Sequence, residues 1–226
     1  MITNYLKVSI RNLISQKGYT LINIFGLAVG IASALLIMLY VIDEISYDKF
    51  HPNANNIQRV CLDAKIQDTE LLGPISCVPI GPTSVNEYPD IINYTRIFNF
   101  SGEPVIRYED RTFVEKNLIY VDSTFFQVFN GFNLIRGNPD NVLNRANHMV
   151  MTESTAKRYF GDDNPVGKVV QFGQNRQNWE VTAVVADPPK NSHIKFDILC
   201  SFVTLPMSQS TMWIGNNNYT YILIQE

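Results

Sequence analysis

The sequence predicts an α+β extracytoplasmic domain carried on one N-terminal transmembrane helix. Two observations predict this class. Residues 18–42 form a run of 25 residues without a charged side chain, and the chain after them interleaves strand-like and helix-like segments irregularly. Only 17% of all residues are charged, against about 25% in an average soluble domain. The net charge of -3 argues against a basic nucleic-acid-binding protein, so we expect no nucleic acid partner.

The uncharged run is long enough to cross a lipid bilayer as an α-helix. At about 1.5 Å per residue it would extend about 37 Å, whereas the hydrocarbon core of a bilayer is about 30 Å thick. A buried core helix seldom runs so far without a charge. A cleaved signal peptide is the other alternative, because Ala32-Ser33-Ala34 has the form of a cleavage site. Six further apolar residues follow that site, which favours an uncleaved span.

The flanking charges orient this span. Lys7, Arg11 and Lys17 precede it without any acidic residue, whereas Lys49 and Arg59 follow it among acidic residues. Because Lys and Arg collect on the cytoplasmic side of a span, the N-terminus is predicted to lie in the cytoplasm. Residues 43–226 then lie outside, with all but three of the 18 basic residues and all 21 acidic residues.

Residues 1–17 are predicted to form an amphipathic helix at the cytoplasmic membrane surface. Lys7 and Arg11 lie four residues apart on one face, and Lys17 follows them. The apolar residues on the other face recur at spacings of three and four: Ile2, Leu6, Ile10, Leu13 and Ile14. A plain helical extension of the span is the alternative.

Small residues within the span suggest contact with another helix. Gly26 and Gly30 form a G-x-x-x-G motif, and Ala34 extends the same row. Such a row lets a second transmembrane helix approach closely, although the motif is also common by chance in apolar helices.

Beyond the span, the sequence pattern predicts a mixture of strands and helices. The segment DEISYDKF is expected to continue the span as a helix. Asp122 and Ser123 are expected to cap a short helix, and Thr152 is expected to cap another that ends at Gly161. One further helix is predicted at 83–91, and further strands are predicted at 57–66, 94–98, 104–108, 111–115, 166–172, 178–186, 196–203 and 219–226.

Motifs for catalysis or metal binding are scarce. Residues 161–168 (GDDNPVGK) resemble a phosphate-binding loop, but the glycine spacing is wrong and Val169 stands where Ser or Thr is needed. His51, His148 and His193 are too widely spaced for a local metal site, and we expect His193 to hydrogen-bond locally in its loop. Cys61 and Cys77 could form a disulfide or, like Cys200, remain free thiols. We therefore expect no catalytic residue, cofactor or metal.

Five segments together carry a resemblance to FtsX/MacB-type ABC transporter permeases. Two lie at the N-terminus, NYLKVSIRNLISQKGYTLINIFGLAVGIA and DEISYDKFHPNANNIQRV. Three lie in the second half of the chain, VDSTFFQVFNGFNLIRGNPDNVL, MTESTAKRYFGDDNPVGKVV and WEVTAVVADPPKNSHIKFDIL. The resemblance identifies residues 43–226 as similar to a MacB-like periplasmic core domain, with a porter-like part and a second small subdomain.

The resemblance implies a protein of the bacterial inner membrane that performs no chemistry itself. A separate cytoplasmic ATPase subunit would hydrolyse ATP, and the span would carry the motion to the outer domain for export or mechanotransmission. Asp43, Glu44 and Asp48 would begin the stalk, and Lys7, Arg11 and Lys17 would lie near the ATPase or the lipid headgroups. A second permease copy or homologue, the lipid bilayer and a periplasmic adaptor are the other partners implied.

Alternatives to a transporter component remain open at this stage. We expect the chain to be the N-terminal part of a longer permease, because the resemblance implies further spans. The alternative is a single-span sensor or adaptor whose outer domain binds a ligand without any ATPase. A membrane-anchored hydrolase would need a nucleophile or a pair of acidic residues that the sequence does not display.

Overall fold

The computed structural model describes residues 2–66, 69–173 and 175–225. The chain divides into two compact units, Met1–Tyr47 and Asp48–Glu226, and each is described by itself.

The first unit consists of two helices, α1 (Ile2–Ser15) and α2 (Lys17–Ile45). Gln16 separates them with φ -110° and ψ 57°. In the described part of the chain, α2 is the one helix long and apolar enough to cross a membrane, with a mean hydropathy of 2.5 in its best window. The helix ends at Ile45, so the expected helical extension through DEISYDKF is wrong beyond that residue. Asp48 adopts φ 57°, which a right-handed helix does not allow.

The second unit is built around one mixed sheet. Among the described residues it has twelve strands, ten of them in the order β1-β14-β5-β8-β13-β10-β12-β11-β6-β7, with β4 beside β14 and β9 beside β12. The strands are β1 (Ile57–Val60), β4 (Ser76–Cys77), β5 (Ile91–Asn99), β6 (Val105–Tyr108), β7 (Arg111–Val114), β8 (Leu118–Val121), β9 (Leu134–Gly137), β10 (His148–Thr152), β11 (Val169–Phe172), β12 (Gln177–Val185), β13 (Ile198–Ser201) and β14 (Asn216–Ile224).

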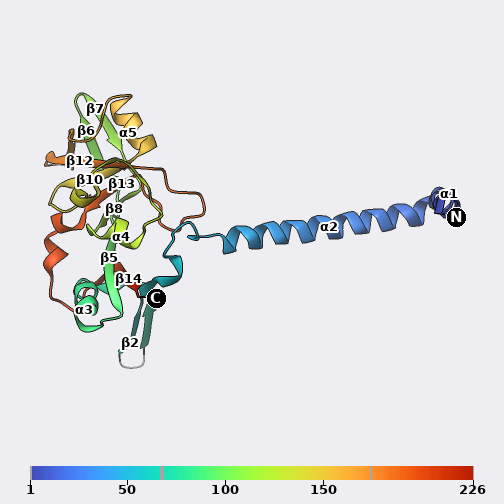
Figure 1. The fold of residues 1–226 in the computed structure, drawn as a ribbon, viewed down its shortest axis with the longest axis horizontal. Helices are drawn as coiled ribbons and strands as arrows, with labels where there is room; N and C mark the ends of the chain where they lie inside the picture. Colours follow the sequence, from blue (N-terminus) through green and yellow to red (C-terminus); the bar gives the residue numbers. More distant parts are fainter. Residues whose placement is uncertain (1, 67–68, 174, 226) are drawn as a thin grey trace. The chain divides into compact units, whose positions relative to one another are not determined.

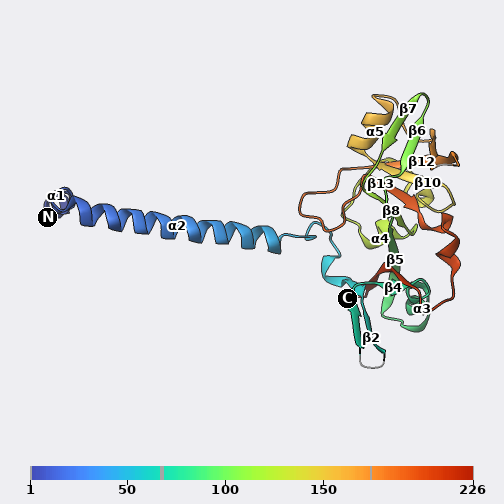
Figure 2. The ribbon, with the colours of Figure 1, turned by 180° about the vertical axis from the view of Figure 1, so that it is seen from behind.

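Short helices and one hairpin complete this unit. The hairpin is β2 (Leu62–Ile66) with β3 (Thr69–Gly73), and the helices are α3 (Ile80–Glu87), α4 (Phe125–Val128), α5 (Glu153–Phe160) and the 3-10 turns η1 (Ala54–Asn56), η2 (Pro139–Asn141), η3 (Phe202–Thr204) and η4 (Pro206–Gln209). Within the unit, α5 and the β6–β7 hairpin lie at one end, and α3 and the β2–β3 hairpin at the other (Figures 1 and 2).

Apolar side chains cover both faces of the sheet. Along β13, Ile198 and Cys200 point into the core that contains α5, whereas Leu199 points into the core that contains α4. The same alternation divides β8 and β10 between the two cores. Because both faces are buried, these central strands read as continuous apolar runs rather than as alternating ones. The α4 core is rich in phenylalanine: Phe125, Phe129, Phe132 and Phe196.

The α+β class with an N-terminal apolar helix is confirmed, and so are several predicted local features. Thr152 caps α5 by accepting a hydrogen bond from the amide of Thr155, and Gly161 ends that helix with φ 64°. Strands β11 and β12 form the predicted antiparallel pair.

Other local predictions need correction. The segment 57–66 is two strands rather than one, because β1 pairs with β14 whereas β2 pairs with β3. The helix predicted at 83–91 is α3, which begins at Ile80 and ends at Glu87. Within the second unit, β2 and β3 form a two-stranded sheet apart from the twelve-stranded one, and a division of this unit into a porter-like part and a second small subdomain stays a prediction. Of the two alternatives left open for the cysteines, the structure has free thiols at Cys61, Cys77 and Cys200.

Candidate functional site

The residues just after α2 are built into the core of the second unit. They meet the loop that follows β12 and the strands β1 and β14. We call the five side chains that meet there the junction cluster: Asp48, His51, Arg59, His193 and Tyr221.

Asp48 connects this segment to the loop after β12. Its backbone amide donates a hydrogen bond to the carbonyl of Asn191 at 2.9 Å. Its side chain accepts from the His193 amide through Oδ1 at 3.0 Å, and its Oδ2 lies 2.5 Å from Nδ1 of His193. The left-handed backbone at Asp48 aims the carboxylate at His193, and Asp tolerates this conformation better than most residues.

His193 extends the connection to β14. Since carboxylate oxygens only accept hydrogen bonds, Nδ1 of His193 carries the proton that faces Asp48. Its Nε2 lies 2.9 Å from the hydroxyl of Tyr221, a side chain that is 6% exposed. Asp48 and His193 are 145 residues apart in the chain, so the expectation that His193 bonds only locally is wrong. Three distant segments are joined through one imidazole ring.

His51 is the most deeply buried member of the junction cluster, at 3% exposure. Its Nδ1 accepts a hydrogen bond from the amide of Gly131 at 3.0 Å, which requires that this nitrogen carry no proton. Its ring lies between aromatic rings, with centroids 4.0 Å from Phe50 and 4.9 Å from Phe132. Burial lowers the pKa of His51 to about 4, although the carboxylate of Asp48 acts in the opposite direction. The ring is therefore neutral at physiological pH.

Gly131 is a position where only glycine fits against this segment. A Cβ atom there would lie 2.7 Å from the carbonyl oxygen of Phe50 and 2.7 Å from Nδ1 of His51. Because the first contact is with backbone, relief would need a shift of the chain itself. The close approach of Gly131 to Phe50 and His51 helps to fix these two residues in position.

The chemistry of the junction cluster is that of a structural link rather than of a catalytic site. Burial raises the pKa of Tyr221, and the neighbouring Arg59 only partly opposes this. The hydroxyl therefore stays protonated and is a poor nucleophile despite the Asp48–His193 pair beside it. Among the described residues, no group of His, Cys, Asp and Glu side chains is arranged to hold a metal ion.

Two cavities adjoin the junction cluster. One, of about 450 Å³, is lined by Asp48, His51 and Phe129 among others. The second, of about 350 Å³, lies over Ile97 and Ile119. Both are lined by Arg59, His193 and Tyr221. Their volumes fall in the range of about 300–1,000 Å³ that is typical of small-molecule sites.

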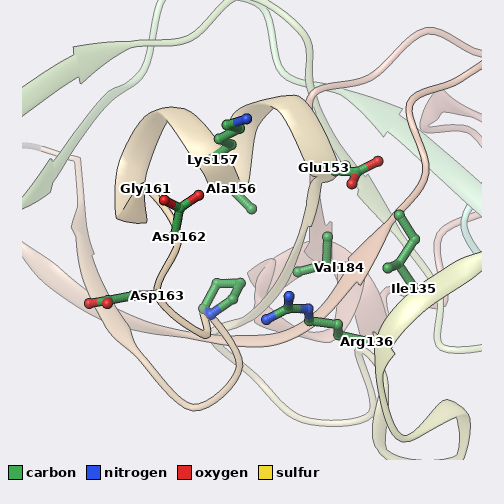
Figure 3. A pocket seen from close by; sticks show the side chains of 10 residues that line it. Ile135, Arg136, Glu153, Ala156, Lys157, Gly161, Asp162, Asp163 and Val184 are labelled. Atoms are coloured by element: carbon green, nitrogen blue, oxygen red, sulfur yellow. The ribbon is translucent and has the colours of Figure 1, made fainter.

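A separate hollow lies beside the loop that resembles a phosphate-binding loop (Figure 3). Its volume is about 210 Å³, below the usual range of about 300–1,000 Å³ for ligand sites. Asp162 and Asp163 line it together with Lys157 and Arg136, so an anionic phosphate would meet carboxylates as well as cations. Asp163 is in addition paired with Lys168 at 2.7 Å, and the loop acts as the turn between α5 and β11.

The family model for the MacB-like periplasmic core domain matches residues 20–225. The chain belongs to the family of MacB-like periplasmic core domains. The family places it among MacB/FtsX-type ABC permeases.

Solved structures agree on the fold of this MacB-like chain. A domain of a putative permease from Porphyromonas gingivalis matches with a TM-score of 0.69 and 24% identity, covering 78% of this chain and 76% of that one. The periplasmic region of MacB from Actinobacillus actinomycetemcomitans matches with a TM-score of 0.52 and 19% identity, covering 76% and 75%. Among curated proteins, none matches the sequence.

The predicted functional residues of this MacB-like chain fall into both units. Asp43 and Glu44 lie in the last turn of α2, whereas Asp48 lies beyond the helix and belongs to the second unit. Lys7 and Arg11 are exposed on α1, and Lys17 begins α2. The small-residue row Gly26, Gly30 and Ala34 is exposed along α2, and apart from the helix's own neighbouring backbone no atom of the described residues lies within 4 Å of a Cβ built on either glycine.

Sequence reasoning missed His51, Arg59 and Tyr221 as members of a site. His51 was considered only as a metal ligand and as part of the segment that resembles the permeases. Arg59 and Tyr221 lie on two strands that are paired with each other, since Arg59 is opposite Tyr221 in the β1–β14 register. Only that strand pairing brings the two side chains together, and no local sequence motif predicts it.

Proposed function

We propose that this chain is a permease component of an ABC transporter in which α2 carries motion between a cytoplasmic ATPase subunit and the outer unit. In this proposal the N-terminus is cytoplasmic, α2 crosses the membrane and the MacB-like unit lies outside the cytoplasm. The chain itself hydrolyses no ATP. A second permease copy packs along the Gly26, Gly30 and Ala34 row, and Lys7, Arg11 and Lys17 lie on the ATPase side.

The short connection between α2 and the core of the second unit is the observation that supports this proposal most directly. Only Ser46 and Tyr47 separate the end of α2 from Asp48. Both form turn hydrogen bonds with the end of α2, because the Ser46 amide donates to the carbonyl of Asp43 at 3.1 Å and the Tyr47 amide donates to the carbonyl of Glu44 at 3.4 Å. The proposed route from the helix to the second unit therefore passes through only two residues.

The contacts of that fixed segment explain why motion would not be lost at the joint. Asp48 is held by His193, and His51 is held by Gly131 and by the surrounding aromatic rings. A long flexible linker would instead average out the movement of the helix. In this proposal the junction cluster holds the first residues of the second unit, to which the two-residue connection from α2 leads.

Purification of the protein from its native membranes tests the existence of an ATPase partner. We expect an ABC ATPase, identified by mass spectrometry from its Walker A peptide, to co-purify in a mild detergent and to show ATPase activity sensitive to vanadate. Recovery of the protein without any such ATPase would favour the alternative of a single-span sensor or adaptor.

An insertion at the joint tests mechanical coupling. Cys61 is exposed while Cys77 and Cys200 are buried, so the rate of thiol labelling reports on the outer unit. We expect ATP to change the labelling rate of Cys61 in membranes that contain the ATPase. A Gly-Ser-Gly-Ser insertion between Ser46 and Tyr47 should abolish that change, and the same insertion between the exposed residues Ser101 and Gly102 should preserve it. An unchanged response after the joint insertion would contradict the proposed route.

A further inference from the structure

We infer that the cavity of about 350 Å³ over β5 and β8 binds a small amphiphilic anion, with a carboxylate head and an aliphatic body. The proposal goes beyond the transporter assignment and does not depend on it. It rests on the floor of the cavity, on the cations at its rim and on how those cations are held.

The floor of this cavity is apolar and well ordered by the core. Ile97 is 4% exposed, Ile119 is 6% exposed and Tyr221 is 6% exposed, and all three line the cavity. They belong to the α4 core. An aliphatic chain lying here would remove further apolar area from water at roughly 25 cal/mol per Å².

The rim of the cavity is cationic. Arg59 comes from β1, and Lys195 comes from the segment between β12 and β13. Neither forms a salt bridge among the residues that the structure describes, and no carboxylate is present in the described lining of the cavity. This is unusual in a unit that contains all but two of the 21 acidic residues of the chain. The charge at the rim is therefore available to an anion.

Lys195 is held in position before any ligand arrives. Its ammonium group donates to the carbonyl oxygens of Pro189 and Lys190, at 3.0 Å and 2.5 Å. An ammonium group has three N–H donors, so one remains for a ligand. A cation whose side chain is already ordered loses less conformational entropy on binding, which favours affinity.

The carboxylate of Asp48 is not part of the lining of this cavity. Asp48 lines the neighbouring cavity instead, and its two oxygens are both engaged by His193. His193 and Tyr221 line both cavities, so a ligand over Ile97 and Ile119 would lie beside the groups that fix the joint after α2. Asn99 adds an amide at the rim that can hydrogen-bond a carboxylate oxygen.

Titration calorimetry with sodium octanoate tests the site directly. The full chain is incorporated into phosphatidylcholine nanodiscs, and the heat of titrating empty discs is subtracted. We expect saturable binding of octanoate with one site per chain. Butyrate, which lacks most of the aliphatic body, and octanamide, which lacks the charge, should each bind at least about tenfold more weakly.

Two variants and one matched control locate the ligand. Arg59→Gln and Lys195→Gln should each weaken octanoate binding about tenfold, the usual effect of losing one charge-assisted hydrogen bond. Lys116→Gln removes an equal charge from an exposed position outside the cavity and should leave the affinity unchanged. Emission from the buried Trp179 verifies that each variant is folded.

Three results would overturn the inference. They are a heat of octanoate no larger than that of empty discs, equal affinities for octanoate and octanamide, and equal losses in Lys116→Gln and Arg59→Gln. The comparison of the three ligands uses the unaltered protein, so the inference stays testable even if a variant fails to fold.

Discussion

Protonation of His51 should destabilise the second unit as the pH falls from 7.5 to 4.5. His51 is 3% exposed and its Nδ1 accepts a hydrogen bond from the Gly131 amide at 3.0 Å. A proton on Nδ1 would break that bond, and a charge would be placed among Phe50, Phe129 and Phe132. The folded state therefore resists protonation more strongly than the unfolded chain does.

The magnitude follows from the pKa values of the two states. The pKa of an unperturbed histidine is 6.5, whereas that of His51 in the folded protein is about 4. A base with a lowered folded pKa contributes its full stability above about pH 6.5, and loses it as the pH falls toward about 4. Each pKa unit corresponds to about 1.4 kcal/mol. Allowing for solvent screening at the junction, we expect a loss of about 1–3 kcal/mol between pH 7.5 and 4.5.

Urea unfolding followed by tryptophan fluorescence measures this loss. The chain has 2 tryptophans, Trp179 in the core and the exposed Trp213, so emission reports the second unit alone. His51→Asn is the matched variant, because its amide oxygen can still accept from Gly131 but the side chain does not ionise. We expect the stability difference between wild type and His51→Asn to shrink by about 1–3 kcal/mol from pH 7.5 to 4.5.

A second variant controls for destabilisation as such. Phe196→Leu weakens the same core without removing an ionisable group, so it should keep the pH dependence of the wild type. If the difference in unfolding free energy between wild type and His51→Asn instead stays constant within about 0.5 kcal/mol over this pH range, the buried neutral histidine is not what makes the unit sensitive to acid.

Three further outcomes are expected. Arg96→Met should destabilise the second unit by about 3–5 kcal/mol, because the largely buried Asp122 loses the guanidinium group that pairs with it at 2.7 Å. A shift in the urea midpoint equivalent to less than about 1 kcal/mol would contradict this prediction. Gly30→Leu should weaken the association of α2 with a second copy in bilayers at least about fivefold, as measured by fluorescence energy transfer. Ala28→Leu lies on another face of α2 and should leave the association unchanged. Equal effects of the two variants would refute a role for the glycine row. In spheroplasts a membrane-impermeant maleimide should label Cys61, which is exposed, and labelling only after permeabilisation would reverse the proposed orientation.

Local chemistry made some elements predictable. The run 18–42 identifies α2 because it carries no charged side chain and because a helix of this length satisfies its own backbone hydrogen bonds in lipid. Thr152 and Gly161 mark the start and the end of α5, because capping depends on the side chain and the backbone freedom of single residues. The β11–β12 hairpin follows from two alternating runs joined by a polar turn.

Strands buried on both faces were not predictable in the same way. The segments at β8 and β10 were not predicted as strands, although each has at least four buried residues in succession. A short apolar run without alternation does not distinguish a fully buried strand from a piece of helix. The burial that explains these runs comes from the two cores on either side, which exist only once the sheet is assembled.

The sequence by itself determined that an apolar helix precedes a mixed α+β unit and that the chain resembles the permease family. Only the tertiary structure decided that Asp48 is fixed by His193, that His51 is buried and neutral, and that Arg59 lies opposite Tyr221. The physical reason is distance along the chain. A span or a helix cap depends on neighbours within a few residues, whereas Asp48 and His193 meet from segments 145 residues apart and the β1–β14 register brings Arg59 opposite Tyr221.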